Sequence, residues 1–232
     1  MQVIILAAGR GTRMGTLTDS VPKPMLKVHG KTLLEHKFDI LPADCEEIIL
    51  VVGYKAEVIR DAYGDSYKGI PVRYIEQETL DGTGGAVWLA RPFIKDRFAV
   101  LMGDDIYGAE DLAATLAAPD WALLVERTKN MAEGGIMVVD ENNHVLGIEE
   151  GDHRGKAGVM NTNLFVLDTR VFEFPLVPKA AGSSEFGLPQ TVVEASKAFG
   201  IPVHAIDSTS WVQVTAPEDI ARAELLVPAP LN

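Results

Sequence analysis

The feature that most constrains the fold of this chain is the alternation of strand-like and helix-like segments through its first half. Short apolar runs rich in β-branched residues are typical of buried strands, and four of them occur, at Gln2–Leu6, Glu47–Val52, Val72–Ile75 and Phe98–Met102. Stretches of helical character lie between them, at Thr32–Leu41, Lys55–Tyr63 and Gly84–Arg91. The alternation predicts a Rossmann-like, doubly wound α/β fold, with a mostly parallel sheet that binds ligands at the carboxyl ends of its strands.

The second half of the sequence is less regular. We expect four more strands, at Ala122–Glu126, Ile136–Asp140, Val145–Glu149 and Asn163–Leu167, with Asn142-Asn143 as a hairpin turn. Helices are expected at Pro189–Phe199 and from about Pro217, where Thr215 and Glu218 have the spacing of a capping box. The tail 227–232 contains two prolines and is expected to fray. Without repeats or linkers, residues 1–232 are interpreted as one domain.

The composition excludes several classes of protein. With 21 Lys+Arg against 33 Asp+Glu, the net charge is −12, opposite in sign to that of a general nucleic-acid binder. The single cysteine, Cys45, permits no intrachain disulfide and is interpreted as a packed residue. The apolar run Val3–Ala8 is shorter than a signal peptide or a membrane span requires. We expect a cytoplasmic protein that binds neither nucleic acid nor membranes, and the sequence indicates no particular oligomeric state.

The loop after the first strand is the most informative segment, and it reads Leu6-Ala7-Ala8-Gly9-Arg10-Gly11-Thr12-Arg13-Met14. The glycines at 9 and 11 allow a ligand to approach backbone amides, and Arg13 adds a fork of donors for phosphate oxygens. The Gly-Lys-Ser/Thr of a Walker loop is absent, and Met14 stands where a dinucleotide-binding loop has its third glycine. The alternative for this loop alone is an ordinary glycine-rich turn.

The segment Pro22-Lys23-Pro24-Met25 follows, and its two prolines stiffen the backbone around Lys23, as suits a lysine aimed at a phosphate. Together the two segments read L-A-A-G-x-G-T-R-M followed by P-K-P-M, which resembles the signature of the sugar-1-phosphate nucleotidyltransferases. The resemblance spans roughly residues 2–226 and implies a nucleotide-binding half over 1–105 and a sugar-binding half over 106–226. It assigns catalytic roles to Arg13 and Lys23, and nucleotide contacts to Leu6, Ala7, Ala8, Gly9, Gly11 and Thr12.

Two further segments match the nucleotide side of this family. Gln77, Gly82 and Thr83 have the spacing of its base-reading motif, and an amide side chain can donate to and accept from a pyrimidine edge. The alternative is a glycine-rich helix start with an exposed Gln77. Gly103 and Asp104 end an apolar strand, and the resemblance makes Gly103 a nucleotide contact and Asp104 a catalytic residue and the ligand of Mg²⁺. We interpret the next residue, Asp105, as a turn residue rather than a partner of this site.

On the sugar side, the resemblance to uridylyltransferases of N-acetylglucosamine 1-phosphate assigns sugar contacts to Gly135, Glu150 and Asn161. The alternative is a solvated acidic hairpin followed by a polar strand. Three positions depart from the family pattern. Gly151 replaces a common lysine, for which Lys156 is a candidate substitute, and Asn163 stands where relatives often have glycine. Where a second metal-binding carboxylate is common, the candidates are neutral, Gln213 and Thr215.

The resemblance implies an enzyme that needs Mg²⁺ and transfers a nucleotidyl group from a nucleoside triphosphate to a sugar 1-phosphate, giving an NDP-sugar and pyrophosphate. UTP is the first choice of nucleotide and dTTP the second, because both present the base edge that Gln77 would read. The alternatives are a cytidylyltransferase acting on a phosphorylated alcohol such as phosphocholine, and a catalytically silent sensor of nucleotide sugars. Bifunctional relatives continue into a left-handed β-helix after this point, so no acetyltransferase activity is expected.

Overall fold

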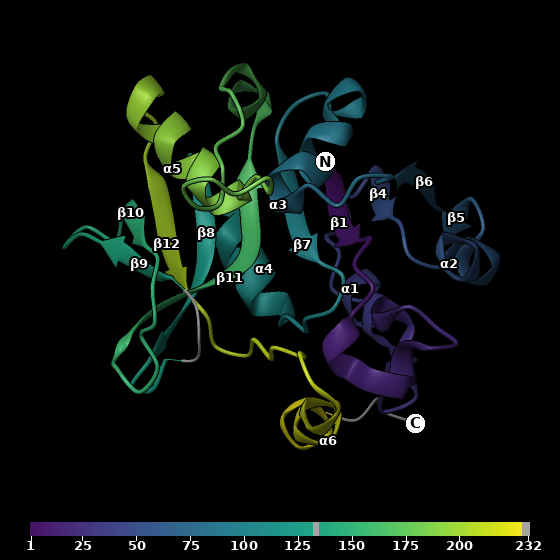
Figure 1. Ribbon diagram of the computed structural model, residues 1–232. Coiled ribbons are helices and arrows are strands. Elements are labelled where there is room, and N and C mark those ends of the chain that lie inside the picture. Colours follow the sequence, from purple (N-terminus) through teal and green to yellow (C-terminus); the bar gives the residue numbers. More distant parts are fainter. Residues whose placement is uncertain (132–134, 229–232) are drawn as a thin grey trace.

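The computed structural model describes residues 1–131 and 135–228, and its centre is one eight-stranded sheet (Figure 1). In spatial order, the strands are β12 (Val203–Asp207), β8 (Trp121–Thr128), β11 (Gly158–Leu167), β7 (Phe98–Met102), β1 (Gln2–Ala7), β4 (Glu47–Val52), β6 (Ile70–Glu76) and β5 (Ser66–Tyr67). Strand β1 is parallel to both β4 and β7, β4 to β6, and β12 to β8, whereas β11 is antiparallel to β7 and β8. The predicted doubly wound, mostly parallel α/β fold is therefore confirmed.

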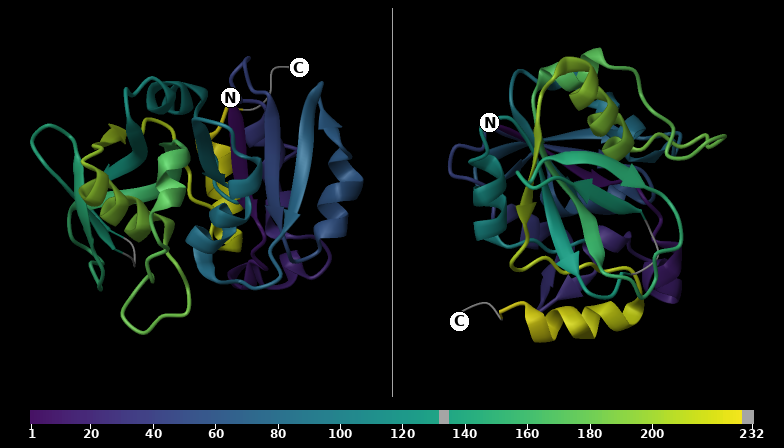
Figure 2. Two further views of the ribbon diagram at one scale, coloured as in Figure 1. Left: turned by 90° about the horizontal axis from the view of Figure 1, so that it is seen from above. Right: turned by 90° about the vertical axis from the view of Figure 1, so that its left-hand side faces the viewer.

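Helices cover both faces of this sheet. They are α1 (Leu33–Phe38), α2 (Ala56–Tyr63), α3 (Gly82–Leu89), α4 (Ala109–Leu116), α5 (Leu188–Phe199) and α6 (Pro217–Leu226), with 3₁₀ turns η1 (Thr12–Thr18), η2 (Lys23–Met25), η3 (Arg91–Phe93) and η4 (Thr169–Glu173). Helices α3 and α5 pack on one face of the sheet, and α1, α2 and α4 pack on the other (Figures 1 and 2). Helix α6 contacts η1 and lies below the sheet in Figure 1.

Strand β1 shows why the sheet forms at the centre of the molecule. Its side chains alternate between the two faces, so Ile4 contributes to the core under α3 and α5 while Val3 and Ile5 contribute to the core under α1, α2 and α4. These three side chains are fully buried. A strand covered on both faces favours an unbroken apolar run over an alternating one, as the sequence of β1 has.

The second half contains elements that the sequence did not indicate. Strand β12 and helix α4 were not expected, and β11 begins at Gly158 rather than at Asn163. The predicted hairpin is confirmed: β9 (Ile136–Val139) pairs antiparallel with β10 (Val145–Glu149), and Asn143 takes a positive φ of 59° in the turn. A second small sheet joins β2 (Lys27–Val28) to β3 (Lys31–Thr32).

The expected capping box of the last helix is wrong by one position. Asp219, rather than Glu218, accepts hydrogen bonds from the backbone of Thr215 at 2.8 Å and of Ala216 at 2.9 Å. Because α6 begins at Pro217, its third residue is Asp219, which is the position that can reach back to the free amides. Of the predicted tail 227–232, residues 229–232 lie outside the described part.

Two smaller expectations concern Cys45 and membrane spans. Cys45 is buried, as its interpretation as a packed residue predicts. Among the helices in the described ranges, none combines the length and the apolar character that crossing a membrane requires.

Candidate functional site

A pocket of about 460 Å³ lies at the edge of the sheet where β1, β4 and β7 have their carboxyl ends. Its lining includes residues predicted for the nucleotide and residues predicted for the sugar: Leu6, Ala8, Gly9, Gln77, Gly82, Thr83, Gly135, Glu150 and Asn161. These residues are up to 155 positions apart in the sequence (161 minus 6), and the parallel strands bring them together. The position agrees with the rule that doubly wound sheets bind ligands at this edge.

The glycine-rich loop after β1 is held between the loops that follow its two neighbouring strands. Tyr54 donates its backbone N–H to the carbonyl of Ala8 at 3.1 Å, and Gly103 donates to the carbonyl of Leu6 at 2.8 Å. Gly11 has a φ of 67°, and a Cβ there would lie 2.8 Å from the Cβ of Lys23. Glycine at this position therefore allows both the left-handed conformation and the close approach of the lysine stem.

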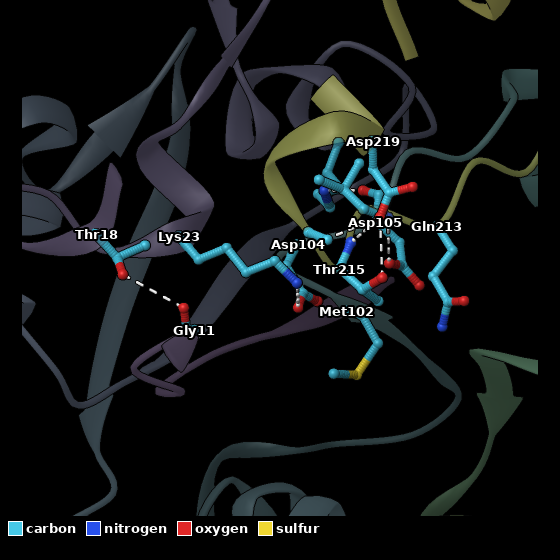
Figure 3. Close-up of polar contacts among 12 residues, drawn as sticks. Gly11, Thr18, Lys23, Met102, Asp104, Asp105, Gln213, Thr215 and Asp219 are labelled. Atoms are coloured by element: carbon cyan, nitrogen blue, oxygen red, sulfur yellow. Dashed lines mark hydrogen bonds and ion pairs between the residues drawn. The ribbon is translucent and has the colours of Figure 1, made fainter. Parts of the chain in front are cut away.

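Lys23 and Asp104 form an ion pair beside this loop, with 2.5 Å between Nζ and Oδ2 (Figure 3). The Lys23 side chain is only 6% exposed, whereas that of Asp104 is 28% exposed. Met25 donates to the carbonyl of Pro22 at 2.9 Å, which closes the 3₁₀ turn η2 around the lysine. A cation held in a fixed position and a carboxylate thus meet at the end of β7, an arrangement suited to binding phosphate together with a divalent metal.

Arg13 and Thr12 are placed differently from the other predicted residues. Both are exposed in η1, and among the described residues they do not belong to the lining of the pocket. Ala7, Gly11, Gly103 and the Lys23–Asp104 pair also lie outside that lining. The structure therefore brings Lys23 and Asp104 together and leaves the role of Arg13 as a prediction.

The interpretation of Asp105 as a turn residue is corrected. Its side chain is buried and accepts hydrogen bonds from the indole of Trp211 at 3.2 Å and from the backbone of Val214 at 3.3 Å. The fully buried ammonium of Lys37 contacts the carbonyl oxygen of Asp105. Burial, together with the Asp104 carboxylate, raises the pKa of Asp105, and burial lowers the pKa of Lys37. Asp105 connects the turn of Asp104 to a segment more than 100 positions later.

That later segment places Gln213 at the pocket. Ile106 and Val212 exchange backbone hydrogen bonds of 2.9 and 2.8 Å, so residues 211–214 run alongside the end of β7. Gln213 lines the pocket, and Figure 3 shows its side chain extending on the same side as Met102. The hydroxyl of Thr215, the other neutral candidate, donates to Asp219 at 2.9 Å and so takes part in the cap of α6.

The residues at this point fit a magnesium ion that takes most of its ligands from the substrates. The described ranges contain no group of three or more His, Cys, Asp or Glu side chains arranged to hold a metal. Asp104 offers one carboxylate, and Gln213, which lines the pocket, offers a neutral amide oxygen. Mg²⁺ is commonly held by one or two carboxylates together with substrate phosphates and water. This donor set suits that mode and does not form a complete protein cage.

On the base side, Gln77 is buried and its amide has a fixed orientation, so the alternative of an exposed Gln77 is wrong. Nε2 donates to the carboxylate of Asp81 at 2.9 Å and to the carbonyl of Gly82 at 3.3 Å. Both partners are acceptors only, so the nitrogen side of the amide must face them. The carbonyl oxygen of Gln77 is the group left to recognise a ligand.

The loop before α5 covers the start of α3, a contact that the sequence did not indicate. Phe186 donates to the carbonyl of Asp81 at 2.6 Å, and Gly84 donates to the carbonyl of Phe186 at 2.9 Å. The hydroxyl of Thr83 accepts from the backbone of Leu188 at 3.0 Å. The loop projects beside α5 (Figure 2) and contributes Lys179, Glu185, Phe186 and Gly187 to the pocket.

On the sugar side, Glu150 and Asn161 lie in the same pocket and each has a polar partner. Glu150 accepts a hydrogen bond from Gln190 at 2.6 Å, and Asn161 donates to the side chain of Asn163 at 2.8 Å. Asn163 has a φ of 59°, a conformation that glycine adopts freely and asparagine tolerates. Its departure from the family's glycine is thereby explained. Lys156 is exposed and lies outside the described lining.

Several lining residues had no signal in the sequence. They are mostly apolar or lie on the loop before α5 and on its first turn: Leu80, Met131, Ile148, Met160, Lys179, Glu185, Phe186, Pro189 and Gln190. Single apolar residues in a strand pattern are indistinguishable from core, so only their position around the pocket reveals them.

The sheet and its site define the class of α/β proteins that bind nucleotides at the carboxyl edge of a doubly wound sheet. Residues 2–222 match the family described as Nucleotidyl transferase, and the chain belongs to this family. The family resemblance predicted from the sequence is therefore confirmed.

Similar proteins act on different nucleotides and sugars. The chain is 31% identical to the bifunctional protein GlmU of Methanocaldococcus jannaschii, covering 96% of this chain and 53% of that protein. It is 28% identical to the UTP–glucose-1-phosphate uridylyltransferase AglF of Haloferax volcanii, covering 97% and 95%. It is 35% identical to the D-glycero-α-D-manno-heptose 1-phosphate guanylyltransferase of Campylobacter jejuni, covering 77% and 81%. The chain thus spans about half the length of the GlmU proteins and nearly all of AglF.

The fold is also found in a solved structure. A putative glucose-1-phosphate thymidylyltransferase from Bacillus anthracis superposes with a TM-score of 0.83 at 22% sequence identity, covering 100% of this chain and 96% of that one. This likeness supports the same arrangement of sheet and helices.

Proposed function

We propose that this chain transfers a nucleotidyl group from a nucleoside triphosphate to a sugar 1-phosphate and releases pyrophosphate. The observation that carries the proposal is the Lys23–Asp104 ion pair, 2.5 Å apart with the lysine buried, beside a pocket lined by residues predicted for both substrates. The relatives named above include transferases of this kind, and the chain belongs to their family.

The proposed reaction is a displacement at phosphorus. A phosphate oxygen of the sugar 1-phosphate attacks the α-phosphorus, and the bond from that phosphorus to the bridging oxygen breaks, with the electron pair leaving on pyrophosphate. The attacking oxygen is already an anion and needs no general base. The difficulty is to hold two anions together on a protein with a net charge of −12. Positioning and electrostatic stabilisation therefore have to supply the rate.

In this mechanism, the backbone amides around Gly9 and Gly11 bind the phosphates, and Lys23 places its ammonium between the two reacting phosphates. Asp104 and Gln213 would hold Mg²⁺, which, when bound, neutralises charge on the phosphate oxygens. Arg13 would stabilise the leaving pyrophosphate. We assign Glu150, Asn161 and the backbone of Gly135 to the sugar hydroxyls. All three belong to the half of the chain, 106–226, that is proposed to bind the sugar.

UTP is the proposed nucleotide, with dTTP second. The carbonyl oxygen of Gln77 requires a donor, which uracil and thymine present at N3–H and which cytosine lacks at that position. The similarity to a uridylyltransferase over almost its whole length supports this choice. Guanine also presents a ring N–H, and the guanylyltransferase relative makes GTP the competing outcome of the test.

The test is to incubate the protein with Mg²⁺, each of five nucleoside triphosphates and a panel of sugar 1-phosphates, and to measure pyrophosphate. We expect release that requires both UTP and one sugar phosphate. Release with CTP and a phosphorylated alcohol would move the acceptor to that class. Nucleotide binding without pyrophosphate release from any pair would contradict the enzyme and favour a silent sensor.

A further inference from the structure

Gln190 is a polar residue of the pocket to which the family resemblance assigns no role. It lies in the first turn of α5 and donates from Nε2 to Oε1 of Glu150 at 2.6 Å. The bond joins two elements 40 positions apart, α5 and the segment after β10. It is the hydrogen bond that orients the carboxylate proposed to bind the sugar.

The other end of the same amide has no partner. Oε1 of Gln190 is buried, and within the described residues nothing donates a hydrogen bond to it. A Cβ at position 187 would lie 1.7 Å from this oxygen, so glycine at this position leaves room for the Gln190 amide in the pocket lining. This oxygen lies against Gly187 and away from solvent, so the Nε2 end of the amide is the one that acts on the pocket.

Charge on the sugar side explains why a neutral amide suits this position. The charged side chains of the described lining are Glu150, Lys179 and Glu185, and Lys179 is paired with Glu185 at 3.6 Å. Glu150 is thus oriented by an amide rather than by a cation. An amide donor keeps one carboxylate oxygen in place and leaves the other able to accept from hydroxyl groups.

We propose that Gln190 determines the specificity of this pocket for its acceptor. Its Nε2 holds one carboxylate oxygen of Glu150 in the sugar-binding position, and the other carboxylate oxygen accepts a hydrogen bond from one donor on the sugar, a ring hydroxyl or an amide N–H. This inference rests on the proposed transfer to a sugar 1-phosphate. Gln190 acts through Glu150 and is therefore a positioning residue.

The test compares Gln190→Leu and Gln190→Glu with the wild type. Lys197→Ala is the control, because Lys197 lies exposed at the other end of α5 in a pair with Glu194. We expect Gln190→Leu to raise the KM of the sugar 1-phosphate about 10- to 100-fold, the value of one hydrogen bond to a charged group. The KM of the nucleotide and kcat should change less than about twofold.

Gln190→Glu tests the hydrogen bond to Glu150 through the pH dependence of the KM for the sugar phosphate. At pH 8 its carboxylate repels Glu150, so the KM of the sugar phosphate should rise as much as in Gln190→Leu. As the pH falls towards 5.5, a shared proton lets one carboxyl donate to the other, and the KM should recover only in this variant. A recovery of equal size in Gln190→Leu would contradict the role.

Deoxy sugar 1-phosphates identify the donor that Glu150, held in place by Gln190, recognises. The wild type should discriminate against one deoxy analogue about tenfold or more, and Gln190→Leu should lose that discrimination. Calorimetric binding of the sugar phosphate separates this inference from the proposed function. A wild type that binds the sugar phosphate but releases no pyrophosphate contradicts only the function, whereas equal Kd values in wild type and Gln190→Leu overturn the role of Gln190.

Discussion

Lys23 shows how a single residue is prepared for its task before any ligand arrives. Its stem passes against Gly11, and its ammonium is 2.5 Å from Asp104 with the side chain 6% exposed. The cost of holding a long side chain in one rotamer is therefore met during folding rather than during binding. On a protein with a net charge of −12, one cation held in this place matters more for an anionic ligand than the average field does.

Replacing Lys23 by alanine should reduce turnover by about 10²- to 10⁴-fold, because a preset cation at the reacting phosphates is removed. Asp104 is 28% exposed, so water can solvate its carboxylate once the lysine is gone. The free energy of unfolding should therefore change little. Steady-state pyrophosphate release and chemical denaturation check the two parts. Lys27→Ala, an exposed position on β2, is the control. Near-full activity of Lys23→Ala would show that the lysine is not part of the reaction.

Gln213→Asp should lower the Mg²⁺ concentration needed for half-maximal activity by about tenfold, since it adds a carboxylate to the pocket lining where the protein offers a neutral amide. A Mg²⁺ titration of the initial rate measures this. Glu218→Asp, at an exposed position in the first turn of α6, should leave the titration unchanged. If Gln213→Asp behaves in the same way, Gln213 does not face the metal.

At the scale of elements, the start of α3 depends on another element for its shape. Gly82 has a φ of 97°, and its neighbours Asp81 and Gly84 exchange backbone hydrogen bonds with Phe186 from the loop before α5. The segment that carries Gln77 and Gly82 is thereby held against the loop before α5, which also lines the pocket. This contact closes the pocket at the end where Gln77 lies.

Gly82→Ala should break this contact, because a Cβ there would lie 2.4 Å from the carbonyl oxygen of Phe186. We expect the nucleotide KM to rise about tenfold or more and the stability to fall by about 2–4 kcal/mol, from strain at positive φ together with the clash. Gly64→Ala is the matched control, since it has a φ of 59° and open space around it. Equal nucleotide KM values in the two variants would rule out this contact as a determinant of binding.

At the scale of the whole molecule, three carboxylates attach the segment 208–216 to the rest of the chain. Asp105 accepts from Trp211 and Val214, and Asp219 accepts from Thr215 and Ala216. Asp111, in the first turn of α4, accepts from the backbones of residues 209 and 210 at 2.9 and 3.0 Å and from nearby hydroxyls. This segment carries Gln213 from the far edge of the sheet to the pocket.

Asp111→Ala should lower the free energy of unfolding by about 3 kcal/mol, because it removes a buried carboxylate that accepts from two backbone amides and from hydroxyls. For a chain of this size, that loss corresponds to a decrease in Tm of roughly 6–12 °C. Calorimetry measures it, and Glu110→Ala, the exposed neighbour in the same turn, should shift Tm by less than about 2 °C. A similar small shift in Asp111→Ala would mean that other contacts hold the segment in place.

The sequence alone determined the alternation of strands and helices, the glycine-rich loop, Lys23 and the Gly103-Asp104 turn. These features are local: strand periodicity, glycine at a tight loop and proline around a lysine are expressed within a few residues. The family resemblance, rather than a local pattern, assigned sugar contacts to Glu150 and Asn161, and both line the pocket.

The tertiary structure decided what depends on contacts between distant segments. Asp105 resembled a turn residue because its partners Trp211 and Val214 are more than 100 positions away. Gln190 and Phe186 had no signal because an amide at a helix start and an aromatic in a loop are common wherever they occur. Burial and hydrogen-bond pairing belong to the packed chain, and they selected which of many ordinary polar residues face the pocket.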